Sequence, residues 1–264
     1  MKKAKEIYEE LERFFKPQLY NDMLPNGLLE DNAEMIGKVY TATFISGEVI
    51  DYLRRIEASD CLIFTHHPVT QIEENGTREL SAENREFLRK NRISHFNYHL
   101  PLDQISPYSP GISFARAIDA VPYGSFFEEG GSVMGVICTG DWKTRTEVIE
   151  RIQQAVGHPC RLYDYGSEEL PDGKIAISAG GAEGTELYDE LEQEGVRLFI
   201  TGVASPQLDW FAPSHPVARE KKISILAAGH YSTEKFALMA MCRFFEERGL
   251  EAEFIGETPN LTDL

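Results

Sequence analysis

The sequence lacks a basic surface, a cysteine framework and any long apolar run. Its 264 residues carry 26 Lys and Arg against 43 Asp and Glu, which gives a formal net charge of −17. A role that depends on non-specific contacts with a phosphate backbone needs a basic footprint, so we do not expect nucleic acid as a partner. The acidic surplus by itself favours metal cations only weakly, because most surface charge is simply solvated.

Cysteine is scarce, and Cys61, Cys138, Cys160 and Cys242 lie far apart with no Cys-x-x-Cys pair. Neither a zinc knuckle nor a disulfide framework is indicated, so we expect four reduced core thiols. No stretch approaches the ~18 apolar residues of a membrane span. The first residues lead into an acidic amphipathic helix instead of the apolar core of a signal peptide. These absences predict a cytoplasmic protein with no membrane partner.

Alternating strand-like and helix-like segments predict an α/β fold. Apolar, β-branched strands are expected at 38–45, 61–65, 93–99, 132–139, 174–179, 197–201, 223–227 and 252–255. Helical spacing is found at 4–15, 48–58, 83–91, 112–120, 145–156, 185–194 and 235–248, and 122–131 is expected to be a connector. Because β-α-β units form parallel pairs with right-handed crossovers, ligands should lie at the carboxyl ends of the strands.

This order predicts two interlocked α/β halves with mixed, largely parallel sheets and a metal site at strand carboxyl ends between them. The first half is expected to comprise 1–121 plus 222–264 and to carry most of the metal ligands. The second half is expected to comprise 122–221. A chain of 264 residues is long enough for either one large domain or two such halves.

The most informative stretch runs from Cys61 to Pro68, where a buried strand is followed by His66 and His67. Adjacent residues on an extended strand point to opposite sides, so the two imidazoles can converge only where the strand breaks. Pro68 favours such a break by restricting the residue before it. The pair could bind a metal, or it could be two hydrogen-bonded loop residues with no chemical role.

Two further predicted strands end in residues of the metal-ligand type. The strand at 93–99 leads to His99 and Asp103, and the strand at 223–227 leads to His230 and Glu234. Each has a structural alternative: His95 and His99 could be core histidines, Asp103 a helix cap, His230 a loop residue and Glu234 a first-turn acid favoured by the helix dipole. The turn at 180–184 could hold an anion with its free amides, although it is also typical of a tight turn.

The coincidence of three such strand ends favours metal binding over the separate alternatives. In one parallel sheet these ends would share an edge. A mixed imidazole and carboxylate set suits zinc, manganese, iron or nickel better than calcium. Three histidines and two acids exceed the three protein ligands usual for one catalytic zinc, whereas two divalent ions about 3.5–4 Å apart would use them all.

These residues resemble the Nif-three-like family (NGG-one-interacting factor three), also called GTP cyclohydrolase I type 2 homologues. The resemblance rests on Thr65–Pro68, Tyr98–Asp103, Gly180–Gly184, Thr201-Gly202 and Gly229–Lys235, with Asn26–Leu28 similar to an early family turn. It spans almost the whole chain, without the extra inserted domain of longer members. After Gly202, Val203–Gln207 replaces the acidic residue and His-His pair of many members, which puts a substrate role of this loop in doubt.

The resemblance implies metal ligands at His66, His67, Asp103, His230 and Glu234, with His99 beside them, and a homo-oligomer, namely a hexameric ring. It also implies GTP cyclohydrolase-like chemistry, in which a metal-bridging water attacks a purine C8 or a phosphoester. We place His99 outside the ligand set as a catalytic group, because Pro101 disfavours a helical turn between His99 and Asp103. The alternative is a non-catalytic metal-binding or regulatory scaffold.

Overall fold

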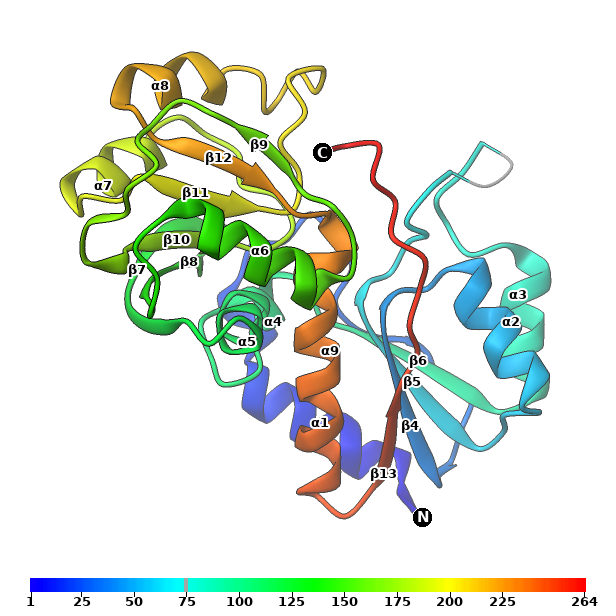
Figure 1. Cartoon of the computed structure of the whole chain (residues 1–264). Helices are drawn as coiled ribbons and strands as arrows, with labels where there is room; N and C mark the ends of the chain where they lie inside the picture. The colour runs from blue at the N-terminus through cyan, green and yellow to red at the C-terminus, as the bar shows by residue number, and fades with distance from the viewer. Residues whose placement is uncertain (74–75) are drawn as a thin grey trace. The chain divides into compact units, whose positions relative to one another are not determined.

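The computed structural model describes residues 1–73 and 76–264 as an α/β protein with two compact units (Figure 1). Unit 1 comprises 1–104, 130–132 and 237–258, and unit 2 comprises 105–129, 133–236 and 259–264. The predicted halves had different bounds, since 105–121, 222–236 and 259–264 group with unit 2 and 130–132 groups with unit 1. Helix α9 (His230–Glu246) contains residues of both units.

Unit 1 is built on a five-stranded sheet with the order β13-β4-β5-β6-β2. The parallel strands are β13 (Glu251–Phe254), β4 (Lys38–Phe44), β5 (Cys61–His67) and β6 (Ile93–Asn97). Strand β2 (Gly27–Glu30) pairs antiparallel with β6. A separate two-stranded sheet joins β1 (Lys2–Lys3) to β3 (Met35–Ile36).

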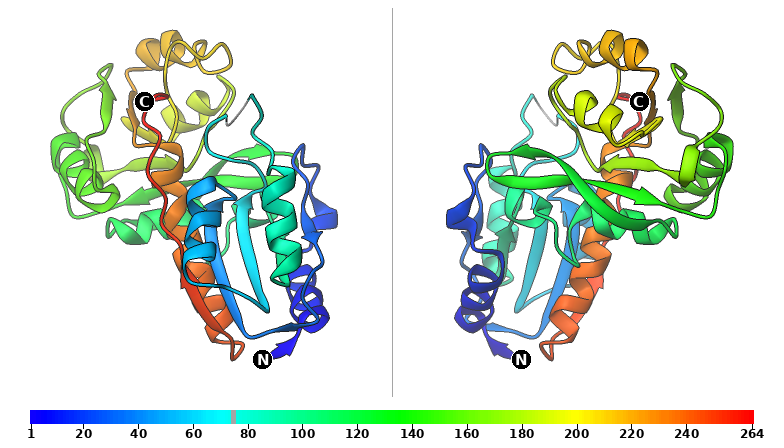
Figure 2. Two further views of the ribbon diagram at one scale, coloured as in Figure 1. Left: turned by 90° about the vertical axis from the view of Figure 1, so that its right-hand side faces the viewer. Right: turned by 90° about the vertical axis from the view of Figure 1, so that its left-hand side faces the viewer.

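Helices cover both faces of this sheet, which explains why its central strands are apolar along nearly their whole length. Helices α2 (Gly47–Arg55) and α3 (Ala82–Lys90) lie on one face, and α1 (Ala4–Phe15) and the later part of α9 lie on the other (Figures 1 and 2). On that second face Phe64 contacts Phe245 with ring centroids 5.8 Å apart. A 3-10 turn at Pro17–Leu19 and the short helix α4 (Leu100–Asp103) complete unit 1.

Unit 2 is built on a six-stranded sheet with the order β7-β8-β10-β11-β12-β9. Its parallel centre consists of β10 (Ile175–Ser178), β11 (Leu198–Thr201) and β12 (Ser224–Ala227). Strands β8 (Ser132–Thr139) and β9 (Arg161–Tyr163) pair antiparallel with β10 and β12. The edge strand β7 (Val121–Glu129) lies beside β8.

Alternating residues of these strands face two separate cores. Helices α5 (Pro110–Ala117) and α6 (Arg145–Val156) pack on one face, while α7 (Leu187–Gln193) and α8 (Ser214–Lys221) pack on the other. Helix α6 begins with a capping box, in which Thr144 and Glu147 bond each other's backbone N–H groups. A 3-10 turn at Pro171–Gly173 precedes β10.

The predicted α/β class and the mixed sheets are confirmed, but the expected connector at 122–131 is wrong. Strand β7 runs through it, and its first residues alternate between exposed and half-buried. Pro122 and Gly124 are tolerated because β7 lies at the edge of its sheet. In the described parts of the chain, no helix has the length and apolar character needed to cross a membrane.

Candidate metal centre

The last two residues of β5 are His66 and His67, and both are buried. The expectation that the strand ends before the histidines is wrong, because β5 stays paired with β4 as far as His67 and Phe44. On its other side, pairing with β6 ends at Thr65. The two imidazole centroids are 4.4 Å apart, and the His67 ring stacks on Phe44 at 4.5 Å. One-sided pairing thus lets neighbouring side chains approach each other at the end of the strand.

The tautomer of His66 follows from its backbone contact. Its Nδ1 lies 3.0 Å from the carbonyl oxygen of Tyr98, which can only accept, so Nδ1 carries the proton and donates it. The Nε2 lone pair then lies 3.3 Å from Oδ1 of Asp103. A nitrogen lone pair and a carboxylate oxygen at this separation favour a cation between them, which is the arrangement of a metal ligand oriented by a hydrogen bond behind it.

His99 and Asp103 lie at the two ends of the turn formed by α4. Pro101 falls in the first turn of this helix, where no backbone N–H is needed, so our argument that Pro101 disfavours a helical turn is wrong. The turn brings His99 Nε2 to 3.8 Å from Oδ2 of Asp103. One ring nitrogen from each of His66, His67 and His99 lies within 4.8 Å of the others. Unit 1 therefore gathers three imidazoles and one carboxylate.

Asp22 supports this cluster and was not among the residues proposed from the sequence. Its Oδ1 accepts a hydrogen bond from His99 Nδ1 at 3.0 Å, and its Oδ2 accepts from the N–H of Leu100 at 2.8 Å. The Asn26 side chain donates to the same carboxylate and accepts a hydrogen bond from the backbone N–H of His99. An acid four residues before an asparagine in a Pro-Asn-Gly turn was the available signal.

These contacts determine how Asp22 and His99 share charge. Burial raises the pKa of Asp22, but the hydrogen bond and the charge of His99 outweigh it and hold that pKa well below its usual range. Burial lowers the pKa of His99, whereas Asp22 and the charge of Asp103 raise it, so the net pKa is raised. The Asp22 carboxylate therefore stays ionised and fixes the orientation of the His99 ring.

The donors of unit 2 lie at the start of α9. His230 is the first residue of this helix and Glu234 lies one turn later, with Nε2 and Oε1 3.1 Å apart. The side chain of His230 is 33% exposed, whereas that of Glu234 is 4% exposed. Helix α9 begins five residues earlier than predicted, which places both groups on one face of a single helix.

Glycines at the ends of β10 and β11 make room for this pair. A Cβ at Gly180, whose φ is +70°, would overlap Glu234 Oε1 and lie 3.3 Å from His230 Nε2. A Cβ at Gly202 would lie 2.8 Å from the His230 Cα. The Gly180 N–H donates to Thr233 Oγ1 at 2.9 Å. Gly180 and Gly202 thus let the backbone approach the two donors closely.

The expectation that all three strand ends share one sheet edge is wrong. His66 and His67 end β5, and His99 and Asp103 follow β6, both strands of the five-stranded sheet of unit 1. His230 and Glu234 instead follow β12 of the six-stranded sheet of unit 2. His95 is a core histidine, because its Nε2 lies 2.8 Å from Thr65 Oγ1 and burial lowers its pKa to about 3.

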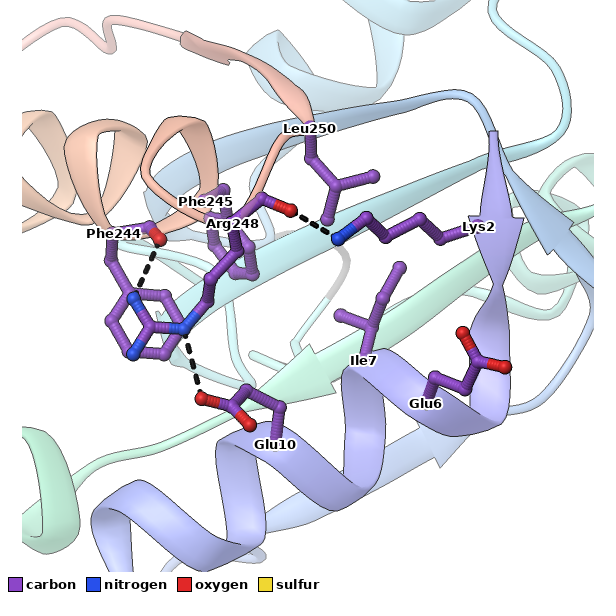
Figure 3. Close-up of a pocket in the computed structure, with 8 residues that line it drawn as sticks. All are labelled: Lys2, Glu6, Ile7, Glu10, Phe244, Phe245, Arg248 and Leu250. Atoms are coloured by element: carbon purple, nitrogen blue, oxygen red, sulfur yellow. Dashed lines mark hydrogen bonds and ion pairs between the residues drawn. The ribbon is translucent and has the colours of Figure 1, made fainter.

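A pocket of about 230 Å³ in unit 1 has a different character (Figure 3). It is lined by Lys2, Glu6, Ile7, Glu10, Phe244, Phe245, Arg248 and Leu250. The Arg248 guanidinium lies 3.5 Å from the Phe244 ring centroid and donates to Glu10, and Lys2 donates to the Arg248 carbonyl. These contacts fasten the amino-terminal segment to the end of α9. Without histidine or cysteine among its lining residues, the pocket lacks the donors of the histidine cluster.

Comparisons with known proteins support the fold and the family. A family model described as Duf34/NIF3 (NGG1p interacting factor 3) matches residues 2–260. A protein of Archaeoglobus fulgidus named GTP cyclohydrolase 1 type 2 homolog is 27% identical over 97% of this chain and 98% of its own length. A protein of the same name from Pseudomonas aeruginosa is 27% identical, covering 96% of each chain.

Solved structures agree with this assignment at the level of fold. The protein ybgI superposes with a TM-score of 0.80 at 24% identity, covering 98% of this chain and all of its own. TTHA1606 from Thermus thermophilus superposes with a TM-score of 0.76 at 22% identity, covering 98% of this chain and all of its own. A family match over nearly the whole chain, together with this fold, shows that the chain belongs to the Duf34/NIF3 family.

Proposed function

We propose that this chain binds two divalent metal ions and acts as a metal-dependent hydrolase. The observation that carries the proposal is the convergence of His66, His67 and His99, with Asp103 facing His66, at one end of the unit 1 sheet. The name of the relatives, GTP cyclohydrolase 1 type 2 homolog, supports this reaction class.

The proposed ligands are His66, His67, Asp103, His230 and Glu234. Imidazole and carboxylate groups together suit zinc, manganese, iron or nickel. Neither unit alone supplies all five of these ligands, so the proposal draws on both donor sets. Together, the five groups exceed the three protein ligands of a usual catalytic zinc site and match a dinuclear site.

In this proposal the protein groups orient ligands and move a proton. Bound divalent ions would supply a water that loses its proton near neutral pH and positive charge that stabilises the transition state. His99 holds Asp22 through Nδ1, which leaves Nε2 to accept a proton and return it. The Tyr98 carbonyl keeps His66 in the tautomer whose Nε2 can bind a metal.

Turnover by metal-loaded protein tests this proposal most simply. A panel of GTP, cyclic nucleotides and generic phosphodiesters should contain at least one substrate that is hydrolysed when metal is present and spared when it is removed by a chelator. Full metal content with no turnover on the whole panel would favour the alternative, a non-catalytic metal-binding scaffold.

His99 has a separate role in this scheme and a separate test. We expect His99→Ala to keep both ions and to lose about 10²- to 10⁴-fold in turnover, which is the usual range for a proton-transferring group. Elemental analysis and rate measurements on the same preparation decide the matter. If His99→Ala loses metal, His99 is a ligand. That outcome is compatible with the geometry, because a ring nitrogen of His99 lies within 4.8 Å of nitrogens of His66 and His67.

We also propose that the chain forms a closed homo-oligomer, namely a hexamer. Support comes from β7, an edge strand on which Val121 is 62% exposed and Tyr123 is 50% exposed. Exposed apolar residues on an edge strand favour contact with another chain. Light scattering at micromolar concentration should return the mass of a hexamer, and a monomer would contradict the proposal.

A further inference from the structure

An exposed tryptophan lies beside the donors of unit 2. Trp210 is 38% exposed and lies in the segment between β11 and α8. The edge of its six-membered ring rests on Gly181, with ring atoms 3.1 and 3.6 Å from the position that a Cβ would take there. The preceding glycine, Gly180, lies against Glu234 and His230. Because consecutive Cα atoms are ~3.8 Å apart, the indole edge lies within about 12 Å of the Glu234 carboxylate.

The surrounding segment holds this side chain in place. Phe211, which is fully buried, contacts the Trp210 ring edge to face at 5.6 Å. The N–H groups of Ala204 and Ser205 donate to the Asp263 carbonyl, and His215 Nε2 contacts the Ala204 carbonyl at 2.9 Å. The indole is therefore presented by an anchored turn, and it loses little conformational freedom when a ligand contacts it.

A structural role explains Trp210 less well than it explains the other tryptophan. Trp142 is 5% exposed, lies in the unit 2 core and donates from Nε1 to the Gly173 carbonyl. For Trp210, no acceptor of the Nε1 proton is found among the described residues. Large aromatic rings with both exposed surface and a spare N–H are typical of binding sites.

The chemistry of one exposed indole selects the kind of ligand. Recognition of a cation usually takes a cage of several aromatic rings, and the neighbouring Phe211 is buried. Stacking of a planar base needs only one ring and is a common use of a single exposed aromatic residue. Gly181 favours this use, because a side chain there would meet the indole edge.

We propose that Trp210 is the platform on which a planar heteroaromatic ring stacks, so that the ligand of the His230 and Glu234 site is a nucleotide. The base would lie against the indole, and the phosphate end would extend toward the two donors. This inference rests on the proposed function and deepens it by assigning the substrate class to a residue of this chain.

Tryptophan fluorescence tests the platform directly, because the sequence contains only two tryptophans. The wild-type, metal-loaded full chain is titrated with GTP, guanosine and ribose 5-phosphate, and the Trp210→Phe variant reports the contribution of Trp142. GTP and guanosine should quench the part of the emission that Trp210→Phe lacks, whereas ribose 5-phosphate should not. Quenching by neither guanosine nor GTP, or emission already insensitive to ligand because another copy covers Trp210, overturns the proposal.

Calorimetry on variants supplies the second readout. Trp210→Ala should weaken GTP binding by about 10- to 100-fold, the range expected for one lost base stack, while metal content stays unchanged. Trp210→Phe should retain most of the affinity, because an aromatic face remains. Equal GTP affinity in Trp210→Ala and wild type would contradict the platform.

The same measurements on Asp103→Ala separate this inference from the hydrolase proposal. If guanosine still quenches Trp210 in that metal-depleted variant, the platform holds whether or not the wild type hydrolyses anything. If the wild type hydrolyses a non-aromatic phosphodiester and guanosine binds nowhere near Trp210, the hydrolase proposal holds and the platform fails.

Discussion

The two units present their candidate donors in different ways. In unit 1, His66 is fully buried and His67 is 5% exposed. The Tyr98 carbonyl orients the His66 ring, and the Asp22 carboxylate orients the His99 ring. In unit 2, the His230 side chain is 33% exposed and lies among glycine turns. Unit 1 therefore holds its donor groups in a buried, oriented arrangement, whereas one of the two donors of unit 2 reaches solvent.

This difference assigns separate tasks to the two donor sets. Ligands that are already oriented lose little freedom on binding a metal, so the unit 1 set should dominate metal affinity. The exposed ring of Trp210, which we propose as the stacking platform, belongs to unit 2.

Removing a carboxylate ligand from each unit compares them directly. Asp103→Ala should lose metal outright, because it deletes an anionic donor that faces His66. Glu234→Ala should reduce metal content less, leaving about one ion per chain. Elemental analysis of proteins purified without chelator measures both, with Asp119→Ala, a position 87% exposed on its side chain, as the control. A metal-free Glu234→Ala beside a fully loaded Asp103→Ala would reverse the assignment.

Asp22→Asn tests the support behind the unit 1 cluster. The amide can no longer offer a charged acceptor to His99, although Leu100 and Asn26 remain close. Loss of a group behind a ligand or catalytic ring typically lowers affinity or activity by about 10–100-fold. Metal titration and turnover should both register the change, while Asp119→Asn should leave both as in the wild type.

Gly180→Ala tests the close approach in unit 2, and Gly195→Ala is its matched control. Both glycines have positive φ, +70° and +74°, but a Cβ at Gly195 meets nothing within 4 Å. The backbone penalty of about 1–2 kcal/mol should therefore appear in both variants. Only Gly180→Ala should also displace Glu234 and lower metal content. Equal stability and equal metal content in the two variants would show that the approach at Gly180 has no consequence.

Glu257→Gln has the smallest expected effect and concerns a buried carboxyl group of unit 1. Burial raises the pKa of Glu257 to about 7, which the hydrogen bond from the Phe44 N–H offsets only in part. Because the folded-state pKa exceeds the unfolded value, the folded state binds more protons between them, and stability falls as pH rises through that window. Between pH 4.5 and 8, the free energy of unfolding should therefore fall by about 2 kcal/mol more in the wild type than in Glu257→Gln. Urea unfolding at both pH values measures this, and identical pH profiles would rule it out.

The sequence predicted most elements because their patterns are local. Helix α6, for example, begins at the Thr144 and Glu147 capping box and ends at Gly157, where φ is +89°. Strand β7 was missed because its edge position tolerates Pro122 and Gly124, and an edge is a property of the sheet, not of the segment.

The site residues also differ in whether a local sequence pattern identifies them. The donor residues could be proposed because histidines and acids follow predicted strands, which is a local signal. Asp22 could not be assigned, since its contact with His99 joins residues 77 positions apart. The shared edge was wrongly predicted because strand order within a sheet depends on which strands pair, and periodicity does not determine pairing.

The central claim is that the chain binds two metal ions, with ligands from both donor sets. Elemental analysis of the wild-type protein under saturating zinc or manganese tests it most directly, with His66→Ala and His230→Ala measured beside it. The account predicts a ratio near two for the wild type and a lower ratio for each variant. A wild-type ratio that stays near one, unchanged by His230→Ala, would contradict it.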